Sequence, residues 1–302
     1  MDGIEVQHLT KSYDGKYNAL NDISFVLPEG RIMGFLGPNG SGKTTTVRIL
    51  NGILKPNFGD ARILGLDILK ETLEIHKICG VMTESAACYE NLTALENLMF
   101  FGSMYGISES ILKERSIKLL KRLELYEHSS KKIKEYSTGM KKRVSLAIAL
   151  IHEPKVLFLD EPTSGLDPEN ALNVTKLIKE LSEENKVTVL LCTHQLKYAE
   201  EICNFYGFVS NGKMLGYGTF EDLTKRFNYK NNIIIKGKDI QEELGIKQID
   251  TGIYKKEVSF DEEISQVLYN ILNKGGKVYE VQRERVNLEE LYFNYVRSEK
   301  NE

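Results

Sequence analysis

Short runs of apolar residues alternate with helical patterns over roughly the first 220 residues of the chain. Between the runs, apolar side chains recur at spacings of three and four, as Val174, Leu177 and Ile178 do, which is typical of a helix with one buried face. Strands that alternate with helices indicate an α/β sheet, here with antiparallel strands at both ends of the region. The turn signal Pro28-Glu29-Gly30 further predicts a β-hairpin between the second and third strands. The expected strands cover residues 4–9, 23–27, 31–36, 61–64, 79–82, 156–160, 188–192, 206–210 and 214–217.

The pattern changes after about residue 226. Further strand runs follow, with one helix that ends at Gly275-Gly276 and a final short helix that begins with Asn287 and Glu290, a pair resembling a capping box. We therefore expect a large domain over residues 1–227 and a small accessory α+β domain over residues 228–302. No catalytic constellation is visible in the second. Its expected strands cover residues 233–235, 257–260 and 277–281, and its first helix begins at Asp261.

A glycine-rich loop joins the strand ending at Leu36 to an expected helix over 44–50. Its sequence, Gly37-Pro38-Asn39-Gly40-Ser41-Gly42-Lys43-Thr44, fits the phosphate-loop pattern G-x-x-x-x-G-K-[ST]. A triphosphate needs several converging backbone N–H donors, which glycines allow, and the following helix points its positive end at the anion. Lys43 would bridge the β- and γ-phosphates, and Thr44 would ligate Mg²⁺. A dinucleotide-binding loop is excluded, because Thr45 stands where its third glycine would be.

A second motif completes this site. The apolar run 156–160 reads as a strand covered on both faces, and it ends in the adjacent carboxylates Asp160 and Glu161. Ligands bind at the carboxyl ends of strands in such sheets. One carboxylate there suits Mg²⁺, and a second that projects oppositely suits a base for an attacking water.

The phosphate loop, the Asp160-Glu161 strand and the segments below follow one another, over residues 1 to about 220, in an order that resembles the ATP-binding subunits of ABC transporters. The segment Ser137-Thr138-Gly139-Met140-Lys141-Lys142-Arg143 precedes the Asp160 strand as the family's signature segment does, and Ser164-Gly165-Leu166-Asp167 follows it like the family's D-loop. His194 matches the family's switch histidine, and Tyr13 lies where the family stacks an aromatic ring on adenine. The residues of the signature segment and the extra C-terminal unit resemble those of the family branch that works with separate ABC-2-type permeases.

The resemblance implies ATP and Mg²⁺ as ligands and a role for each matching residue. Thr44 and Asp160 would hold Mg²⁺, Glu161 would be the base, and His194 would sense the γ-phosphate. Ser137 and Gly139 would touch the γ-phosphate of a nucleotide bound to a second copy of the chain. The full set of expected nucleotide contacts is Tyr13, Gly37, Pro38, Asn39, Gly40, Ser41, Gly42, Lys43, Thr44, Thr45, Ser137, Gly139 and Asp167.

The sequence departs from the family pattern at two places. Thr138 and Met140 replace a glycine and a glutamine of the signature. Glu84 aligns with the glutamine of the family's Q-loop. A carboxylate cannot donate a hydrogen bond as an amide does, although it can accept one from Mg²⁺-bound water. We therefore count Glu84 with the expected metal site, and a degenerate regulatory ATP-binding module stays open as an alternative.

Composition and charge narrow the class of protein. The net charge of −3 gives no support to a nucleic-acid binder, and the runs Lys131-Lys132 and Lys141–Arg143 read as solvated faces or contacts to neighbouring chains. The four cysteines lack the spacing of zinc ribbons. No apolar run reaches the length of a membrane span, and no signal peptide is visible.

We thus expect a P-loop α/β ATPase of the ABC type, with an antiparallel β-subdomain, a helical insert around residues 90–150 and the small C-terminal domain. Two copies would sandwich ATP, since one chain carries one loop and one signature. The protein would be cytoplasmic and peripheral at the inner face of the membrane through a permease on another chain, which selects the substrate. A ribosome-acting ATPase normally carries two cassettes in one chain, and this chain carries one. A chromosome-organising ATPase would carry long coiled coil between Lys43 and Ser137, and the stretch between these residues is too short for it.

Overall fold

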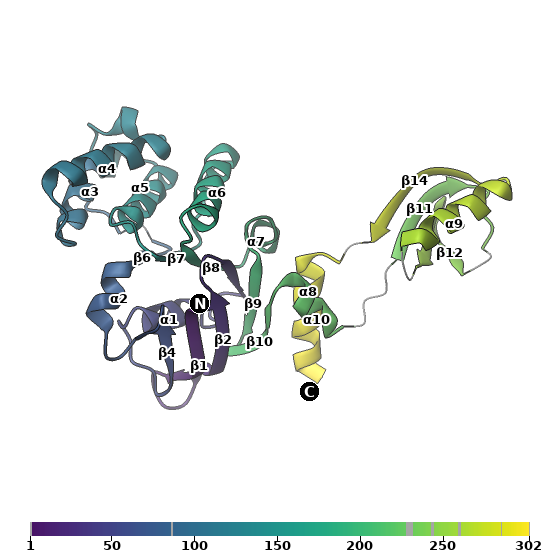
Figure 1. Cartoon of the computed structure of the whole chain (residues 1–302), viewed down its shortest axis with the longest axis horizontal. Coiled ribbons are helices and arrows are strands. Elements are labelled where there is room, and N and C mark those ends of the chain that lie inside the picture. The colour runs from purple at the N-terminus through teal and green to yellow at the C-terminus, as the bar shows by residue number, and fades with distance from the viewer. Residues whose placement is uncertain are drawn as a thin grey trace. The chain divides into compact units, whose positions relative to one another are not determined.

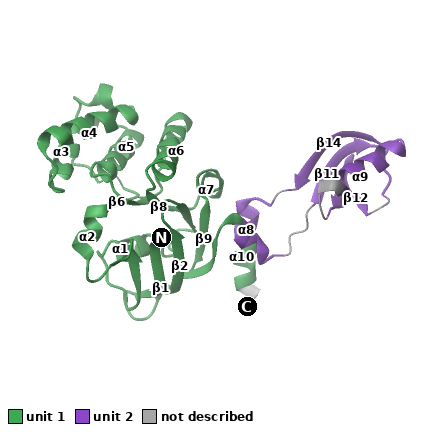
Figure 2. Ribbon diagram, viewed as in Figure 1, with its two compact units in different colours: residues 1–220, 294–302 green, residues 221–293 purple. Residues whose placement is uncertain are grey.

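The computed structural model describes residues 2–85, 87–227, 232–242, 245–258, 261–284 and 286–301 (Figure 1). By its contacts the chain divides into two units (Figure 2). The first comprises Met1–Phe220 and Asn294–Glu302, and the second comprises Glu221–Phe293. The sequence pattern predicts a boundary near residue 227 and a small domain that includes the whole C-terminus, whereas the contacts assign residues 294–302 to the large unit.

The first unit is built around a six-stranded sheet of order β10-β9-β3-β8-β7-β6. Its strands are parallel except for β10, which pairs antiparallel with β9. Every residue of β3, β7 and β8 is buried, as expected for parallel strands covered on both faces. The strands are β3 (Ile32–Leu36), β6 (Cys79–Met82), β7 (Val156–Asp160), β8 (Thr188–Thr193), β9 (Phe205–Ser210) and β10 (Lys213–Gly218).

The register of the central strands brings the expected site residues to one edge. Leu36 at the end of β3 pairs with Thr193, and Asp160 at the end of β7 pairs with Cys192. The segments that follow these strands begin with Gly37, Glu161 and His194. The phosphate loop, the carboxylate pair and the histidine therefore meet at the carboxyl edge of three adjacent strands.

A second, antiparallel sheet of order β2-β1-β4-β5 confirms the expected β-subdomain. The hairpin predicted between the second and third strands is wrong, because β2 pairs with β1 and β3 pairs with β8 and β9. The turn at Glu29-Gly30 carries the chain from one sheet to the other. Burial alternates along β2 but is complete along β3, which needs cover on both faces. The strands are β1 (Asp2–Ser12), β2 (Asn18–Pro28), β4 (Phe58–Ile63) and β5 (Leu66–Asp67).

Helices α3, α4 and α5 form the expected helical insert and contact one another. Thr93 begins α3 with a complete capping box, and Ser137 begins α5 by accepting a hydrogen bond from the backbone N–H of Met140. Two 3₁₀ turns, Tyr126–His128 and Ile133–Glu135, lie between α4 and α5. The helices of this part of the chain are α1 (Lys43–Leu50), α2 (Thr72–Ile78), α3 (Ala94–Ser103), α4 (Glu109–Arg122), α5 (Thr138–Leu150), α6 (Pro168–Glu183) and α7 (Leu196–Ile202).

The C-terminal region has the expected α+β character. Its antiparallel sheet has the order β12-β13-β11-β14, and Ile233, Ile235, Tyr254, Val267 and Ile271 belong to its apolar core. The strand expected over 257–260 instead ends at Glu257, and residues 259 and 260 lie outside the described ranges. Its elements are α8 (Phe220–Lys225), β11 (Asn232–Lys238), β12 (Ile246–Asp250), β13 (Ile253–Glu257), α9 (Asp261–Asn273), β14 (Lys277–Glu284) and α10 (Leu288–Asn301).

The end of the chain packs on the large unit through Tyr295. Its ring meets that of Phe208 on β9 edge to face, with centroids 5.2 Å apart, and both side chains are buried. Tyr295→Ala should therefore lower the free energy of unfolding by about 2–4 kcal/mol. Urea denaturation measures this, with the exposed Tyr269 as control, whose alanine variant should stay within about 0.5 kcal/mol of wild type. Equal midpoints for the two variants would contradict this packing.

Candidate active site

The phosphate loop is closed around its own lysine. The Nζ atom of Lys43 donates to the carbonyl oxygens of Gly37 at 2.7 Å and Pro38 at 3.0 Å, and the side chain is buried. The Oγ of Ser41 is buried as well and has no hydrogen-bond partner among the described residues. Gly42 begins α1 without a side-chain cap, so the first N–H groups of this helix stay available to an anion.

Gly42 combines a left-handed backbone conformation with close neighbours on the side where a Cβ would stand. Its φ of +108° lies in the left-handed region, and a Cβ there would stand 2.5 Å from Leu20 Cδ2 and 2.7 Å from the Ala19 carbonyl oxygen. The positive φ would strain the backbone of any residue with a Cβ, and the two short distances would make that Cβ clash with its neighbours. The loop therefore keeps its curl only with glycine at this position.

Gly42→Ala should abolish measurable ATP binding and lower the melting temperature, because the loop must move away from β2 to admit a methyl group. Gly65→Ala is the matched control, since Gly65 also has a positive φ but no atom within 4 Å of its Cβ position. The control should cost only about 1 kcal/mol and leave nucleotide affinity unchanged. Titration with a fluorescent ATP analogue checks both variants, and wild-type affinity in Gly42→Ala would refute the steric argument.

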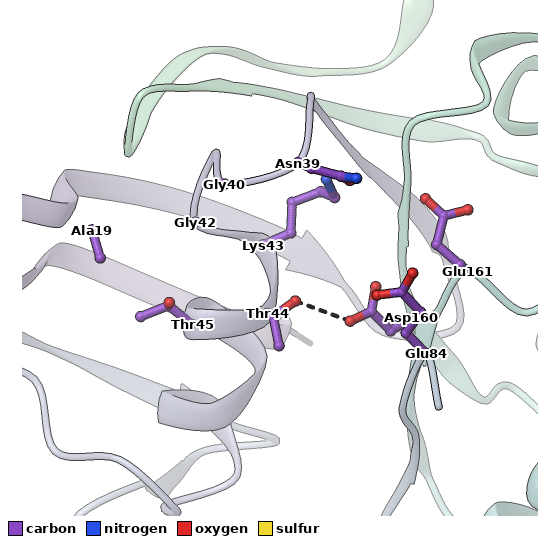
Figure 3. Close-up of a pocket in the computed structure, with 10 residues that line it drawn as sticks. All are labelled: Ala19, Asn39, Gly40, Gly42, Lys43, Thr44, Thr45, Glu84, Asp160 and Glu161. Carbon is purple, nitrogen blue, oxygen red and sulfur yellow. Dashed lines mark hydrogen bonds between the residues drawn. The ribbon is translucent and has the colours of Figure 1, made fainter. Parts of the chain in front are cut away.

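A pocket of about 330 Å³ opens between the loop and the ends of β6 and β7 (Figure 3). Three carboxylates, from Glu84, Asp160 and Glu161, gather in it opposite Lys43 and Thr44 (Figure 3). We call these three side chains the carboxylate cluster. The hydroxyl of Thr44 donates to Asp160 Oδ2 at 3.0 Å. The lining residues are Ala19, Asn39, Gly40, Gly42, Lys43, Thr44, Thr45, Glu84, Asp160 and Glu161.

The donor set of this pocket fits Mg²⁺. Hydroxyl and carboxylate oxygens are the ligands that this ion prefers, and it usually completes its shell with water and substrate phosphates. Burial raises the pKa of Asp160, and the neighbouring charges of Glu84 and Glu161 raise it further, against the lowering effects of the Thr44 hydrogen bond and of Lys43. Anionic groups crowded in this way favour a bound cation.

Glu161 is held at its carboxylate by the next strand. Thr193 donates its hydroxyl to Oε2 at 2.9 Å, and the backbone N–H of His194 donates to Oε1 at the same distance. The Nδ1 atom of the His194 ring lies 2.6 Å from Oε1. The side chain is nearly buried, yet it lines the pocket. The structure therefore joins Glu161 and His194, which are distant in sequence, into one hydrogen-bonded unit.

The sequence comparisons now decide the family. The family profile described as ABC transporter matches residues 20–164. The linearmycin resistance ATP-binding protein LnrL of Bacillus subtilis is 31% identical over 304 residues, covering 96% of this chain and 97% of its own. The chain belongs to the ABC transporter ATP-binding proteins. The bacitracin transport ATP-binding protein BcrA of Bacillus licheniformis is 37% identical, over 74% of this chain and 72% of its own.

Solved ABC cassettes share the fold of the first unit. An ATP-binding subunit of an ABC transporter matches with a TM-score of 0.69 at 30% identity, over 74% of this chain and 92% of its own. A cassette dimer in a post-hydrolysis state with ADP and Pi matches with a TM-score of 0.67 at 27% identity, over 72% of this chain and 98% of its own. This ABC ATPase thus has the P-loop fold that was predicted. None of its described helices has the length and apolar character needed to cross a bilayer.

Within one copy of this ABC ATPase, Ser137, Gly139 and Asp167 lie outside the residues that line the pocket. Ser137 and Asp167 cap α5 and α6, and a Cβ on Gly139 would stand 3.0 Å from Leu166 Cδ2. The start of the signature segment therefore lies against the D-loop. Tyr13 is 60% exposed, with its hydroxyl 3.3 Å from Thr45 Oγ1 at the edge of the pocket.

The structure also corrects one expectation and adds residues that the motifs did not mark. Lys142 and Arg143 are buried, so the run Lys141–Arg143 is not a solvated face. The Nζ atom of Lys142 donates to the backbone carbonyl of Glu161 at 2.8 Å. Ala19 lines the pocket and Thr193 anchors Glu161, and no local pattern distinguishes either residue in the sequence.

Proposed function

We propose that this ABC ATPase cleaves Mg·ATP with Glu161 as the general base and with Lys43, Thr44 and Asp160 as its phosphate and metal ligands. The observation that carries the proposal is the pocket in which these four side chains and the N-terminus of α1 converge. Mg²⁺ held by Thr44 and Asp160 would neutralise charge on the phosphates and orient them. Lys43 would exchange its contacts to the loop carbonyls for the β- and γ-phosphates.

Hydrolysis then needs a base beside the γ-phosphate. In the reaction a water oxygen forms a bond to the γ-phosphorus, the bond from that phosphorus to the bridging oxygen of ADP breaks, and the water proton passes to Glu161. A carboxylate fixed by Thr193 and His194 presents its remaining lone pairs in one direction. His194 would hold this geometry and report the presence of the γ-phosphate.

Two copies of the chain would complete each site. Ser137 and Gly139 lie outside the residues that line the pocket of their own copy. The matched cassettes include dimers, one of them with ADP and Pi. We infer a head-to-tail dimer in which the signature segment of one copy covers the phosphate loop of the other. The dimer would close when ATP binds and open after hydrolysis.

The motion would drive a separate permease of the ABC-2 type at the inner face of the cell membrane. LnrL and BcrA, which are named as ATP-binding proteins of a resistance and a transport system, support this partner class. The test is capture of the full-length tagged chain from detergent-solubilised membranes of its own cells, followed by sequencing of what co-purifies. An integral membrane protein in stoichiometric amount is expected, and capture of ribosomal proteins instead would refute the proposal.

Glu84 gives a prediction at the metal end of the pocket. If its carboxylate accepts from the water shell of Mg²⁺, Glu84→Ala should lower turnover at least about tenfold, as losses in the outer shell of a metal do. Glu84→Gln should be milder, since the amide oxygen still accepts a hydrogen bond. Hydrolysis measured against Mg²⁺ concentration distinguishes the two. Wild-type turnover of Glu84→Ala at all concentrations would remove Glu84 from the metal site.

A further inference from the structure

Lys142 reaches Glu161 from helix α5, the helix that begins at the signature serine. Its side chain is only 6% exposed, and its Nζ atom donates to the Glu161 carbonyl oxygen at 2.8 Å. It is not among the residues that line the pocket, so it acts on Glu161 through the backbone and not through a bound nucleotide. Helix α5 therefore joins Ser137, at its N-terminus, to the candidate base.

The backbone of Glu161 is in a conformation that needs such support. Its φ of +49° lies in the left-handed region, which is strained for a residue with a Cβ. The N–H of Glu161 donates to the Cys192 carbonyl oxygen at 2.9 Å, and its own carbonyl accepts from Lys142. Strained backbone of this kind persists where the surroundings fix it from several sides. The hydrogen bond from Lys142 is one of the contacts that fix this backbone.

Lys142 is also a buried cation beside the carboxylate cluster. Burial lowers the pKa of its ammonium group, while the charges of Glu161, Glu84 and Asp160 raise it in that order. Among the same carboxylates, burial raises the pKa of Asp160, and the charges of Glu84 and Glu161 raise it further. A glutamate at position 84 adds one negative charge that the family's glutamine would not have.

We propose that Lys142 is a positioning residue for hydrolysis, whose ammonium group holds the backbone carbonyl of Glu161. The inference rests on the proposed role of Glu161 as the base. Loss of Lys142 would let the Glu161 backbone relax and would leave the carboxylate cluster with less positive charge beside it. Both effects displace or misorient the base, and small displacements of catalytic groups cost large factors in rate.

The first test is Lys142→Met in the full-length chain, which keeps the aliphatic stem and removes the donor and the charge. Turnover at saturating ATP should fall at least about tenfold, while the KM for ATP and the affinity for a fluorescent ATP analogue change less than about threefold. Lys118→Met, which removes an exposed cation from α4 in the same helical insert, should behave like wild type. A variant that turns over ATP normally, or one that loses affinity and keeps kcat, would overturn the proposal.

The second test uses Lys142→Gln, whose amide is shorter than the lysine side chain and carries no charge. Because it cannot reach the Glu161 carbonyl oxygen as the ammonium group does, turnover should also fall at least about tenfold, with the KM for ATP changed less than about threefold. Wild-type turnover in this variant would contradict the positioning role. Should Lys142→Met not fold, the glutamine variant carries the comparison of kcat with KM.

The role of the base is tested separately, so that the two failures can be told apart. If Glu161→Gln is inactive and Lys142→Met is fully active, only the positioning role is wrong. If Glu161→Gln itself hydrolyses ATP normally, the assignment of the base is wrong and the positioning role fails with it.

Discussion

Glu161→Gln is expected to lower ATP turnover at least about a hundredfold while leaving ATP affinity within a few-fold of wild type. The amide has nearly the same shape, but it cannot accept the proton of the attacking water. The amide oxygen can still accept from the backbone N–H of His194, and the amide nitrogen can donate to the Thr193 hydroxyl, which turns to accept, so the folded site should tolerate the change. With hydrolysis blocked, the closed state should accumulate, and ATP should produce a dimer in size-exclusion chromatography.

The matched control is Glu183→Gln, which changes an exposed carboxylate at the end of α6. It should hydrolyse ATP normally and show no ATP-trapped dimer. If Glu161→Gln keeps wild-type turnover, another group takes the proton. If it is inactive and also fails to bind the nucleotide, the substitution has damaged the pocket and Glu161 is not specifically a base.

Lys43→Met is expected to lower ATP affinity at least about tenfold and turnover about a hundredfold or more, because a fixed charge beside the transferred phosphate is lost. The change also leaves the carbonyl oxygens of Gly37 and Pro38 without the donor that closes the loop. The variant should therefore be less stable to heat in the absence of nucleotide. Calorimetric titration with ATP and a thermal unfolding curve measure the two effects.

Arg48→Met serves as control for Lys43, since Arg48 is an exposed cation on the same helix. It should bind and hydrolyse ATP like wild type. Equal losses in both variants would mean that the general positive charge of α1, and not the position of Lys43 inside the loop, attracts the nucleotide.

The phosphate loop and the Asp160-Glu161 strand could be predicted from sequence because each is a local pattern with its own cause. The loop needs glycines and a lysine at fixed spacing, and a strand covered on both faces is apolar at every position. The strand expected over 156–160 matches β7, and the strand over 79–82 matches β6. Both patterns depend on residues that are adjacent in the sequence, so they can be recognised without knowing how the rest of the chain packs.

Pairing partners and burial could not be predicted in the same way. The turn at Glu29-Gly30 is real, but a turn does not determine whether the next strand pairs with the last, and β3 instead enters the parallel sheet. Likewise, nothing local separates Lys142, which is buried against Glu161, from Lys141, which pairs with Glu90. The packing of Tyr295 on Phe208 joins residues far apart in the chain, which no periodicity reveals.

The central claim is that the chain hydrolyses ATP in sites that two copies complete. It is tested most directly by the rate of phosphate release per chain, measured with Mg·ATP over a wide range of protein concentrations. The rate per chain should rise with concentration and then level off as dimers saturate, and the Glu161→Gln variant should release almost no phosphate throughout. A rate per chain that is constant down to the lowest concentration, from protein that sediments as a monomer, would contradict the claim.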